Sequence, residues 1–483
     1  MRRRQRAVLA ASAAAALLIA STAAAQAESA QATTEQAAPA AAVQAFPYPV
    51  HEQTLDNGLK VVVIPYDSPG IVAYFTVVRT GSRQEVEAGH SGFAHFFEHM
   101  MFRGTDRYSA DEYNDVLKRI GADSNAFTTD DYTNYYIIGP SSELETMMDI
   151  ESDRFQNLEY SEDVFRTEAL AILGEYNKNV SSPFLPMYER LRELAFQKHT
   201  YQHTTMGFLE DIQAMPGYYD YSLSFFDRFY RPENTVLLVV GDVEPRRVHA
   251  LARKYYGSWE KGYKPVTIEA EPEQKKEQTA RLDWPTPTRP HVMVGYHVGA
   301  FDAAGEETAA LDLIAQLLFS DSAPLYQELV VDKQWVDTIS GDAAFRRDPY
   351  LFTIVARVKS EELVPKVMQT VESHIARLQQ EKVDPARLER IKSHLRYQFA
   401  LGLDSPGAVA FSAANMLNLT GEVEPINTLY ARYQKVTPEE IQRVARRVFQ
   451  PERRTVVTLA HRAPEVAPAD STTTDGAAAE AGE

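Results

Sequence analysis

The sequence of 483 residues contains no cysteine. Disulfide bonds, thiolate metal ligands and a cysteine nucleophile are therefore excluded, and the fold depends on its hydrophobic core. Lysine and arginine are also few beside the acidic residues, 49 against 67, which gives a formal net charge of -18. A chain this acidic repels polyanions, so no nucleic acid partner is expected.

A long apolar run that could cross a membrane is missing as well. The one Ala/Leu-rich run, Ala7 to Ala20, is too short and too rich in alanine for a permanent span. Four arginines precede it and small residues follow, which is typical of a signal peptide over residues 1–27, cleaved after Ala25 or Ala27. The sequence therefore predicts export to the periplasm and no stable membrane insertion. Residues 28–45 and 463–483, rich in small and polar residues, predict a disordered lead-in and tail.

Histidine is scarce, with 12 in the chain, yet several stand together in the stretch from Gly89 to Thr105. Read as a helix, this stretch places His95, Glu98 and His99 at i, i+3 and i+4, so the three side chains project from one face. Neutral imidazoles are good zinc ligands, and a carboxylate beside them can take a proton from an attacking water. The order His-x-x-Glu-His is the inverted zinc-peptidase signature. Phenylalanine and methionine cover the rest of the helix, which argues against a solvated polar face.

Two histidines leave the metal site incomplete, so a third protein ligand must come from elsewhere. Glu168 and Glu175 are seven positions apart in a helical stretch and lie on one face of it. Either of them could reach the metal. By spacing alone, a pair of surface glutamates is about as probable as a ligand and its neighbour.

With these motifs the sequence resembles the M16 metallopeptidases, the family of pitrilysin, insulin-degrading enzyme and mitochondrial processing peptidase. The resemblance covers roughly residues 50 to 460 and is closest to the half-length subfamily typified by the processing-peptidase beta subunit. Two further segments carry it. Gly121 to Tyr136 matches the segment that lines the family's cleft, and Phe229 to Asn234, followed by Gly241-Asp242, matches the end of its first domain.

The resemblance implies a role for each of these residues. His95, His99 and Glu175 would bind one zinc ion per chain, and Glu98 would be the general base. Glu168 would be a carboxylate that orients a ligating imidazole. The implied substrate contacts are Asn125, Ala126 and Phe127. Without the family, Asn125 would be interpreted as a turn residue with a local hydrogen bond.

The chain also repeats itself at one constant offset. When the sequence is shifted so that Phe229 to Glu233 meets Val448 to Glu452, a predicted strand at 132–138 meets 351–357 in the same register. Asp56-Asn57-Gly58 predicts a hairpin turn, residues 73–78 a further strand and residues 142–157 a helix. We therefore expect an α+β fold of two homologous αβ-roll domains, each a mostly antiparallel sheet covered by helices.

The expected domains are a zinc-binding domain over residues 46–262, a linker over 263–290 and a second domain over 291–462. In the second copy the segment that should face the zinc helix, Thr308 to Phe319, has no histidine. We therefore expect the second domain to be an inactive structural wall.

One departure from the family bears on partners. Self-sufficient relatives carry an Arg and, seven positions later, a Tyr after a Leu-aromatic-x-Glu stretch. Here that stretch is Leu325 to Glu328, and the two positions hold Val330 and Asp337, which cannot replace the missing donors. This predicts a paralogous M16 subunit that supplies the Arg/Tyr pair. Nearby, Arg346 and Arg347 have the wrong spacing and are interpreted as exposed loop charges.

Together these features predict a zinc metalloendopeptidase that hydrolyses peptides or unfolded polypeptides in an enclosed cleft, as the zinc-bearing subunit of a heterodimer. Two alternatives remain. The chain could be a non-catalytic structural or peptide-holding subunit of a larger complex, although its complete ligand set speaks against this. It could also be a zinc hydrolase of non-peptide bonds.

Overall fold

The computed structural model describes residues 44–462. The predicted signal peptide, nearly all of the predicted lead-in and the predicted tail lie outside the described residues. None of the helices in the described part has both the length and the apolar composition needed to cross a bilayer.

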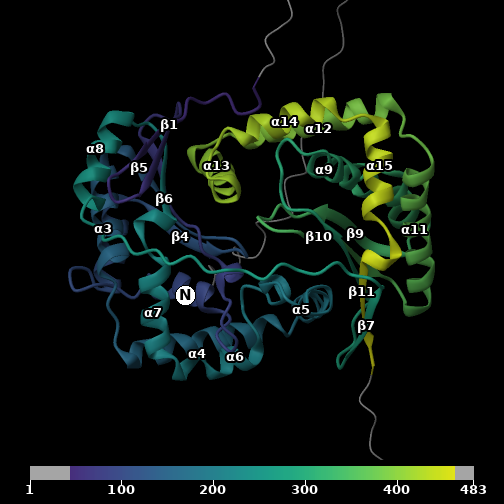
Figure 1. Cartoon of the computed structure of the whole chain (residues 1–483), viewed down its shortest axis with the longest axis horizontal. Coiled ribbons are helices and arrows are strands. Elements are labelled where there is room, and N and C mark those ends of the chain that lie inside the picture. Colours follow the sequence, from purple (N-terminus) through teal and green to yellow (C-terminus); the bar gives the residue numbers. More distant parts are fainter. Residues whose placement is uncertain (1–43, 463–483) are drawn as a thin grey trace, which may run out of the picture. The chain divides into compact units, whose positions relative to one another are not determined.

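Residues 51–256 form a six-stranded sheet with eight helices, which we call the first half (Figure 1). Its strands are β1 (His51–Thr54), β2 (Lys60–Pro65), β3 (Ile71–Val78), β4 (Asp123–Thr128), β5 (Thr133–Pro140) and β6 (Thr235–Gly241), in the order β1-β2-β6-β3-β5-β4. All neighbours are antiparallel except β2 and β6. The predicted hairpin at Asp56-Asn57-Gly58 and the predicted strands at 73–78 and 132–138 are confirmed. Strand β4 forms one edge of the sheet.

Residues 278–461 form a second sheet with seven helices, which we call the second half. Its strands are β7 (Gln278–Trp284), β8 (His291–Val298), β9 (Val336–Ala343), β10 (Tyr350–Val358) and β11 (Arg454–His461), in the order β7-β11-β8-β10-β9. The order matches β2-β6-β3-β5-β4, and the first residues of the matching central strands β6 and β11 are related by the offset seen in the sequence. The repeat and the α+β fold class are confirmed. The predicted linker, residues 263–290, contains β7, so the second sheet begins inside that stretch.

The helices follow the same duplication. Those of the first half are α1 (Phe93–Met100), α2 (Ala110–Ile120), α3 (Leu144–Asn157), α4 (Glu162–Asn179), α5 (Phe184–Ala195), α6 (Leu209–Ala214), α7 (Tyr219–Phe229) and α8 (Pro245–Tyr256). Those of the second half are α9 (Glu306–Phe319), α10 (Pro324–Tyr326), α11 (Val364–Gln380), α12 (Pro385–Gly402), α13 (Pro406–Thr420), α14 (Pro425–Lys435) and α15 (Pro438–Val448). The first residues of helices α7 and α15 are related by the same offset as β6 and β11.

Each half contributes one helix to the core of the other. Helix α13 of the second half packs on β3 and β6, where its small residues Ala410 and Ala413 share a buried cluster with Phe75 and Leu238. Helix α5 of the first half packs on β8 and β11, where Leu191 meets Met293. The first sheet is therefore covered on both faces, which explains why β3 and β6 are continuous apolar runs without alternation.

Candidate metal centre

The helix with the His-x-x-Glu-His motif, α1, is held at its first turn by buried side chains. Gly92, the N-cap residue, has a φ of +92°, which suits only glycine, and a Cβ there would lie 2.7 Å from the carbonyl oxygen of Met206. The carboxylate of Glu85 accepts the backbone N–H groups of Gly92 at 2.8 Å and Ala94 at 2.7 Å. These bonds satisfy donors that the start of a helix leaves free, and they fix the direction of α1.

Glu85 gives a testable pH dependence of stability. Its side chain is fully buried, and burial raises its pKa from 4.5 to about 8 despite the two backbone donors. Because the folded pKa lies above the unfolded one, the carboxyl group contributes stability below pH 4.5 that is lost as the pH rises through about 8. We expect the metal-free wild type to lose melting temperature between pH 5 and pH 8 relative to Glu85→Gln, which cannot ionise. Parallel thermal unfolding curves that keep the same spacing at both pH values would contradict this.

Three of the predicted residues come together between α1 and α4. His95, His99 and Glu175 each offer a ligand atom, and these atoms all lie within 4.8 Å of one another. His95 Nε2 lies 3.9 Å and His99 Nε2 3.6 Å from the same carboxylate oxygen, Glu175 Oε2. No other group of three such residues gathers in this way within residues 44–462.

The trio fits a zinc ion in both distance and chemistry. Tetrahedral zinc with bonds of about 2.0–2.1 Å holds its ligand atoms about 3.3 Å apart, and the separations of 3.6 and 3.9 Å from Glu175 Oε2 are close to that spacing. His95 is 8 % exposed, and burial lowers its pKa to about 3, so its imidazole is neutral and its lone pair is free for a cation. A carboxylate and two imidazoles are also a ligand set that zinc accepts in catalytic sites.

Glu98 projects from the same helix but is not part of the trio. The hydroxyl of Thr128, at the end of β4, donates to Glu98 Oε2 at 2.7 Å. Burial raises the pKa of Glu98, and this hydrogen bond only partly offsets the effect. A carboxylate that is held in place, free of the ligand set and more basic than usual is suited to proton transfer near neutral pH.

Glu168, which precedes Glu175 on α4, lies behind His99 instead of beside the trio. His99 Nδ1 donates to Glu168 Oε1 at 2.9 Å, which leaves Nε2 facing Glu175. Arg103 forms an ion pair with the other oxygen of Glu168. Burial would raise the pKa of Glu168, but His99 and Arg103 outweigh it, so the pKa is lowered and the carboxylate stays charged. Spacing in the sequence could not distinguish Glu168 from Glu175 as the metal ligand. In the structure Glu175 lies beside the two imidazoles, and Glu168 lies behind His99. His95 Nδ1 has no such hydrogen-bond partner in the described part of the chain.

This arrangement predicts that Glu168→Ala weakens zinc binding without removing the site. Loss of a carboxylate that orients a ligating imidazole costs about 10- to 100-fold in metal affinity. We expect that loss in a competition titration against a chelator, with one zinc still bound at saturation. The matched control is Glu162→Ala on the same helix, since Glu162 forms its ion pair with the exposed Arg166. Equal zinc affinities in the two variants would show that Glu168 does not orient His99.

The predicted substrate segment lies on the edge strand β4, which contacts α1. Asn125 is exposed, and its Oδ1 accepts the N–H of Ala126 at 2.9 Å, so the local hydrogen bond exists, but in a strand and not in a turn. Ala126 is buried, and the ring of Phe127 lies 6.0 Å from that of Phe411 on α13. In the described residues no strand pairs with the outer edge of β4.

Sequence reasoning missed three residues of this centre: Thr128, Arg103 and Glu85. Thr128 directly follows the predicted substrate residues, and Arg103 lies within the motif stretch. Glu85 gave no local signal, because its contacts depend on how the chain before α1 folds back onto the helix.

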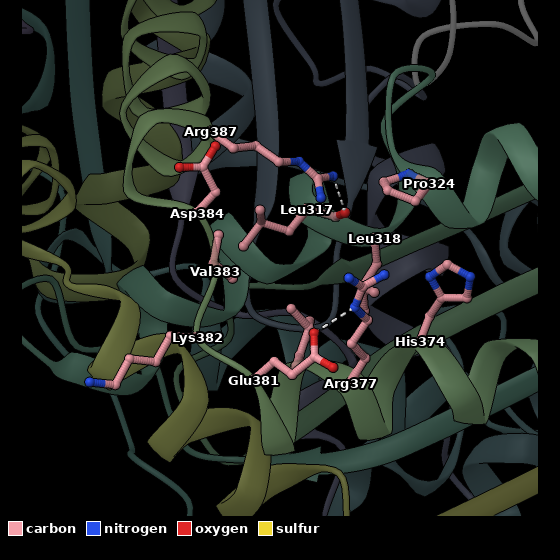
Figure 2. A pocket seen from close by; sticks show the side chains of 11 residues that line it. Leu317, Leu318, Pro324, His374, Arg377, Glu381, Lys382, Val383, Asp384 and Arg387 are labelled. Atoms are coloured by element: carbon pink, nitrogen blue, oxygen red, sulfur yellow. Dashed lines mark hydrogen bonds and ion pairs between the residues drawn. The ribbon is translucent and has the colours of Figure 1, made fainter.

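The second half has lost this chemistry at the equivalent place. At the offset of the repeat, Ile314, Leu317 and Leu318 stand for His95, Glu98 and His99, and Arg387 and His394 stand for Glu168 and Glu175. Figure 2 shows the resulting pocket, in which Arg387 points to Leu317 and donates to its backbone oxygen at 2.8 Å. The guanidinium of Arg387, bonded to the end of α9, thus takes the place of the carboxylate of Glu168, and His394 takes the place of Glu175.

The structure bears on two features of the late segment, of which it tests only the second. Asp337, at the position of the missing Tyr, accepts hydrogen bonds from Arg289 and Arg357, so it is engaged within the second half. The interpretation of Arg346 and Arg347 as exposed loop charges is wrong. Both are partly buried and contact the first half or α13, because the loop before β10 turns back onto the β4–β5 turn.

The fold and the site define a class: a duplicated αβ protein in which one half carries a His-x-x-Glu-His helix and the other does not. Comparison with known families agrees. Residues 61–208 match the family model described as Insulinase (Peptidase family M16), and residues 219–395 match the model described as Peptidase M16 inactive domain. The chain belongs to peptidase family M16.

Two curated relatives are matched over most of their length. The chain is 29% identical over 434 residues to "Zinc protease PqqE" of Helicobacter pylori, covering 85% of this chain and 93% of the relative. It is 23% identical to "Uncharacterized zinc protease YmxG" of Bacillus subtilis, with coverage of 83% and 96%. Among solved structures, a protease from Helicobacter pylori superposes with a TM-score of 0.80 at 28% identity, over 86% of this chain and 99% of that one. The periplasmic protease PqqL of Escherichia coli shares the fold at a TM-score of 0.71 and 17% identity, over 85% of this chain and 47% of its own.

Proposed function

We propose that this protein is a zinc metalloendopeptidase that cleaves peptides or unfolded polypeptides. The observation that carries the proposal is the convergence of His95, His99 and Glu175, with Glu98 free beside them. Membership of the M16 family and the zinc proteases among the relatives support it.

In the proposed mechanism His95, His99 and Glu175 would hold one zinc ion, and that ion would supply Lewis-acid chemistry, namely polarisation of a carbonyl group and a lower pKa of a nearby water. Glu98 takes the proton of the attacking water and later passes it to the leaving amine. Thr128 fixes one oxygen of Glu98 by its hydrogen bond, which leaves the other oxygen for the proton. Glu168 accepts from Nδ1 of His99, which keeps the imidazole in the tautomer whose Nε2 lone pair faces Glu175 and would be free to bind a metal.

The substrate is proposed to bind as an extended strand along β4. The outer edge of β4 offers backbone N–H and C=O groups next to α1, and Asn125, Ala126 and Phe127 lie along it. Backbone pairing of this kind recognises peptides with little regard to sequence. It favours peptide bonds over other hydrolysable bonds as the target.

We further propose that the chain works in the periplasm with a paralogous M16 subunit that supplies an Arg/Tyr pair. Val330 and Asp337 offer no such donors, and Asp337 is already held by two arginines. The chain shares its fold with about half of PqqL and with the solved first half of that protein, which supports a pairing of two units of this size. Of the proposed domains, the first keeps residues 46–262, and the second takes in β7 and therefore begins at Gln278 instead of residue 291. The missing pair also favours the second candidate, a subunit that holds peptides without cutting them.

The test is to purify the full chain, measure its zinc content, and assay cleavage of an unstructured peptide with and without a paralogous M16 chain that lacks His-x-x-Glu-His. We expect one zinc per chain, little turnover alone and cleavage in the mixed complex. Full turnover by the chain alone would contradict the proposal that a partner subunit is needed. A zinc-loaded complex that binds the peptide but never cuts it would favour the peptide-holding candidate.

A further inference from the structure

A buried cluster of charges joins the two halves at the turn between β4 and β5. Asp130, which is 3 % exposed, receives a guanidinium from each half. Arg192 of α5, itself buried, lies with Nη1 2.8 Å from Asp130 Oδ1, and Arg346, in the loop before β10, donates from Nε to Oδ2 at 2.7 Å. The carboxylate is thus shared between a first-half and a second-half arginine.

The neighbouring Asp131 is held in the same way. The hydroxyl of Tyr201 donates to Asp131 Oδ1 at 2.6 Å, and the backbone N–H of Arg347 donates to Oδ2 at 3.0 Å. Asp348, in the loop before β10 that also contains Arg346 and Arg347, accepts from Arg83 Nε at 2.6 Å. The backbone N–H of Arg83 in turn donates to the carbonyl oxygen of Asp130 at 2.7 Å. The loop of the second half therefore grips the β4–β5 turn at several points.

This charge cluster is better explained as fixing the position of the β4–β5 turn than as increasing the free energy of unfolding. A buried ion pair carries a desolvation cost that can cancel its attraction, so its usual value is to fix one arrangement over others. Burial alone would raise the pKa of Asp130, but Arg192 and Arg346 together hold it well below its usual range, so the carboxylate is charged. The charge cluster therefore fixes the position of the β4–β5 turn relative to the two halves.

The turn connects directly to the proposed general base. Shortly before Asp130 in the chain, the hydroxyl of Thr128 donates to Glu98 Oε2. The turn between them is stiff: the N–H of Thr129 donates to the carbonyl oxygen of Tyr132 at 2.8 Å, and Thr129 Oγ1 accepts the N–H groups of Asp131 and Tyr132. A displacement at Asp130 therefore moves Thr128, and with it the carboxylate that Thr128 holds.

We propose that Arg346 is a positioning residue for catalysis: from the second half, it fixes the β4–β5 turn so that Thr128 orients Glu98. The second half is then a working part of the active site, in addition to being a wall. The proposal rests on the proposed role of Glu98. It assigns to Arg346 a role that follows neither from the metal centre nor from the missing Arg/Tyr pair.

The first experiment does not need activity. In hydrogen exchange of the metal-free full chain, Arg346→Ala should speed exchange of the amides of residues 129–133 about tenfold, because the turn opens locally. Arg346→Lys should lie between Arg346→Ala and the wild type. The control is Lys60→Met, which removes a different contact between the halves, Lys60 Nζ to the carbonyl oxygen of Gly421 at 2.7 Å. Unchanged exchange in Arg346→Ala, or equal changes in the control, would overturn the proposal.

The second experiment measures coupling in the zinc-loaded complex that shows turnover. Arg346→Ala should lower kcat about 10- to 100-fold with KM and zinc content little changed, the size expected when a catalytic group is misplaced. Thr128→Val should have a similar effect, and the double variant should lose little more, because both act through Glu98. Losses that multiply would overturn the proposal. A wild-type complex without turnover would instead count against the proposed function, and the exchange result would then decide whether Arg346 orders the turn.

Discussion

Replacing Glu98 by glutamine is expected to abolish turnover while zinc stays bound. The ligand trio does not include Glu98, so the site keeps all of its ligands. Glutamine keeps the shape of the side chain and can still accept the hydrogen bond of Thr128, but it cannot take a proton from water. Loss of a general base costs between about 10²- and 10⁴-fold in rate. The check is kcat on an unstructured peptide together with zinc analysis of the same sample.

The matched control for this variant is Glu189→Gln. Glu189 is a half-buried glutamate of α5 whose carboxylate accepts from Tyr176 at 3.2 Å, and burial raises its pKa to about 7. It resembles Glu98 in burial and in accepting from a hydroxyl group, but it lies on α5 and not on the motif helix α1. We expect Glu189→Gln to keep turnover. A Glu98→Gln protein with kcat close to wild type would remove the base assignment, and loss of zinc in that variant would make Glu98 a ligand.

The second large effect is expected for His95→Ala, which should lose zinc. His95 supplies one of the three ligand atoms that gather within the described residues, and burial keeps its imidazole neutral. Loss of a residue that merely orients a ligand costs about 10- to 100-fold, so removal of the ligand itself should cost at least about 100-fold in zinc affinity. Zinc analysis after dialysis and chelator competition both report this loss.

His90→Ala is the control for that measurement. His90 precedes α1, and its ring packs against Tyr218 at 4.5 Å and Tyr221 at 4.1 Å, away from the trio. It should keep one zinc per chain and full affinity. If His95→Ala retained zinc as well as His90→Ala does, the metal would have to bind elsewhere.

Much of the fold was predictable from local patterns in the sequence. The hairpin at Asp56-Asn57-Gly58, the strand at 132–138 and the repeat that relates Phe229 to Val448 were all predictable, because turn residues, apolar runs and self-similarity are properties of short segments. The positions of His95, Glu98 and His99 on one face followed from helix geometry in the same way.

What failed depends on contacts between distant segments. Spacing could not separate Glu168 from Glu175, since the choice is made by the way α4 crosses α1. The sequence also gave no sign that α5 and α13 would each cover the sheet of the other half. The prediction that Arg346 is exposed was wrong for the same reason. The acidic turn that binds its guanidinium lies far earlier in the chain, and the sequence does not show that the two segments are in contact.

The most direct test of the account is anomalous diffraction at the zinc edge from crystals of the zinc-loaded chain. The account predicts one strong peak in the first half, about 2.0–2.2 Å from His95 Nε2, His99 Nε2 and a carboxylate oxygen of Glu175, with Glu168 bonded to His99 and not to the metal. No peak at this trio, or a peak coordinated by Glu168 or Glu98 in place of Glu175, would contradict it.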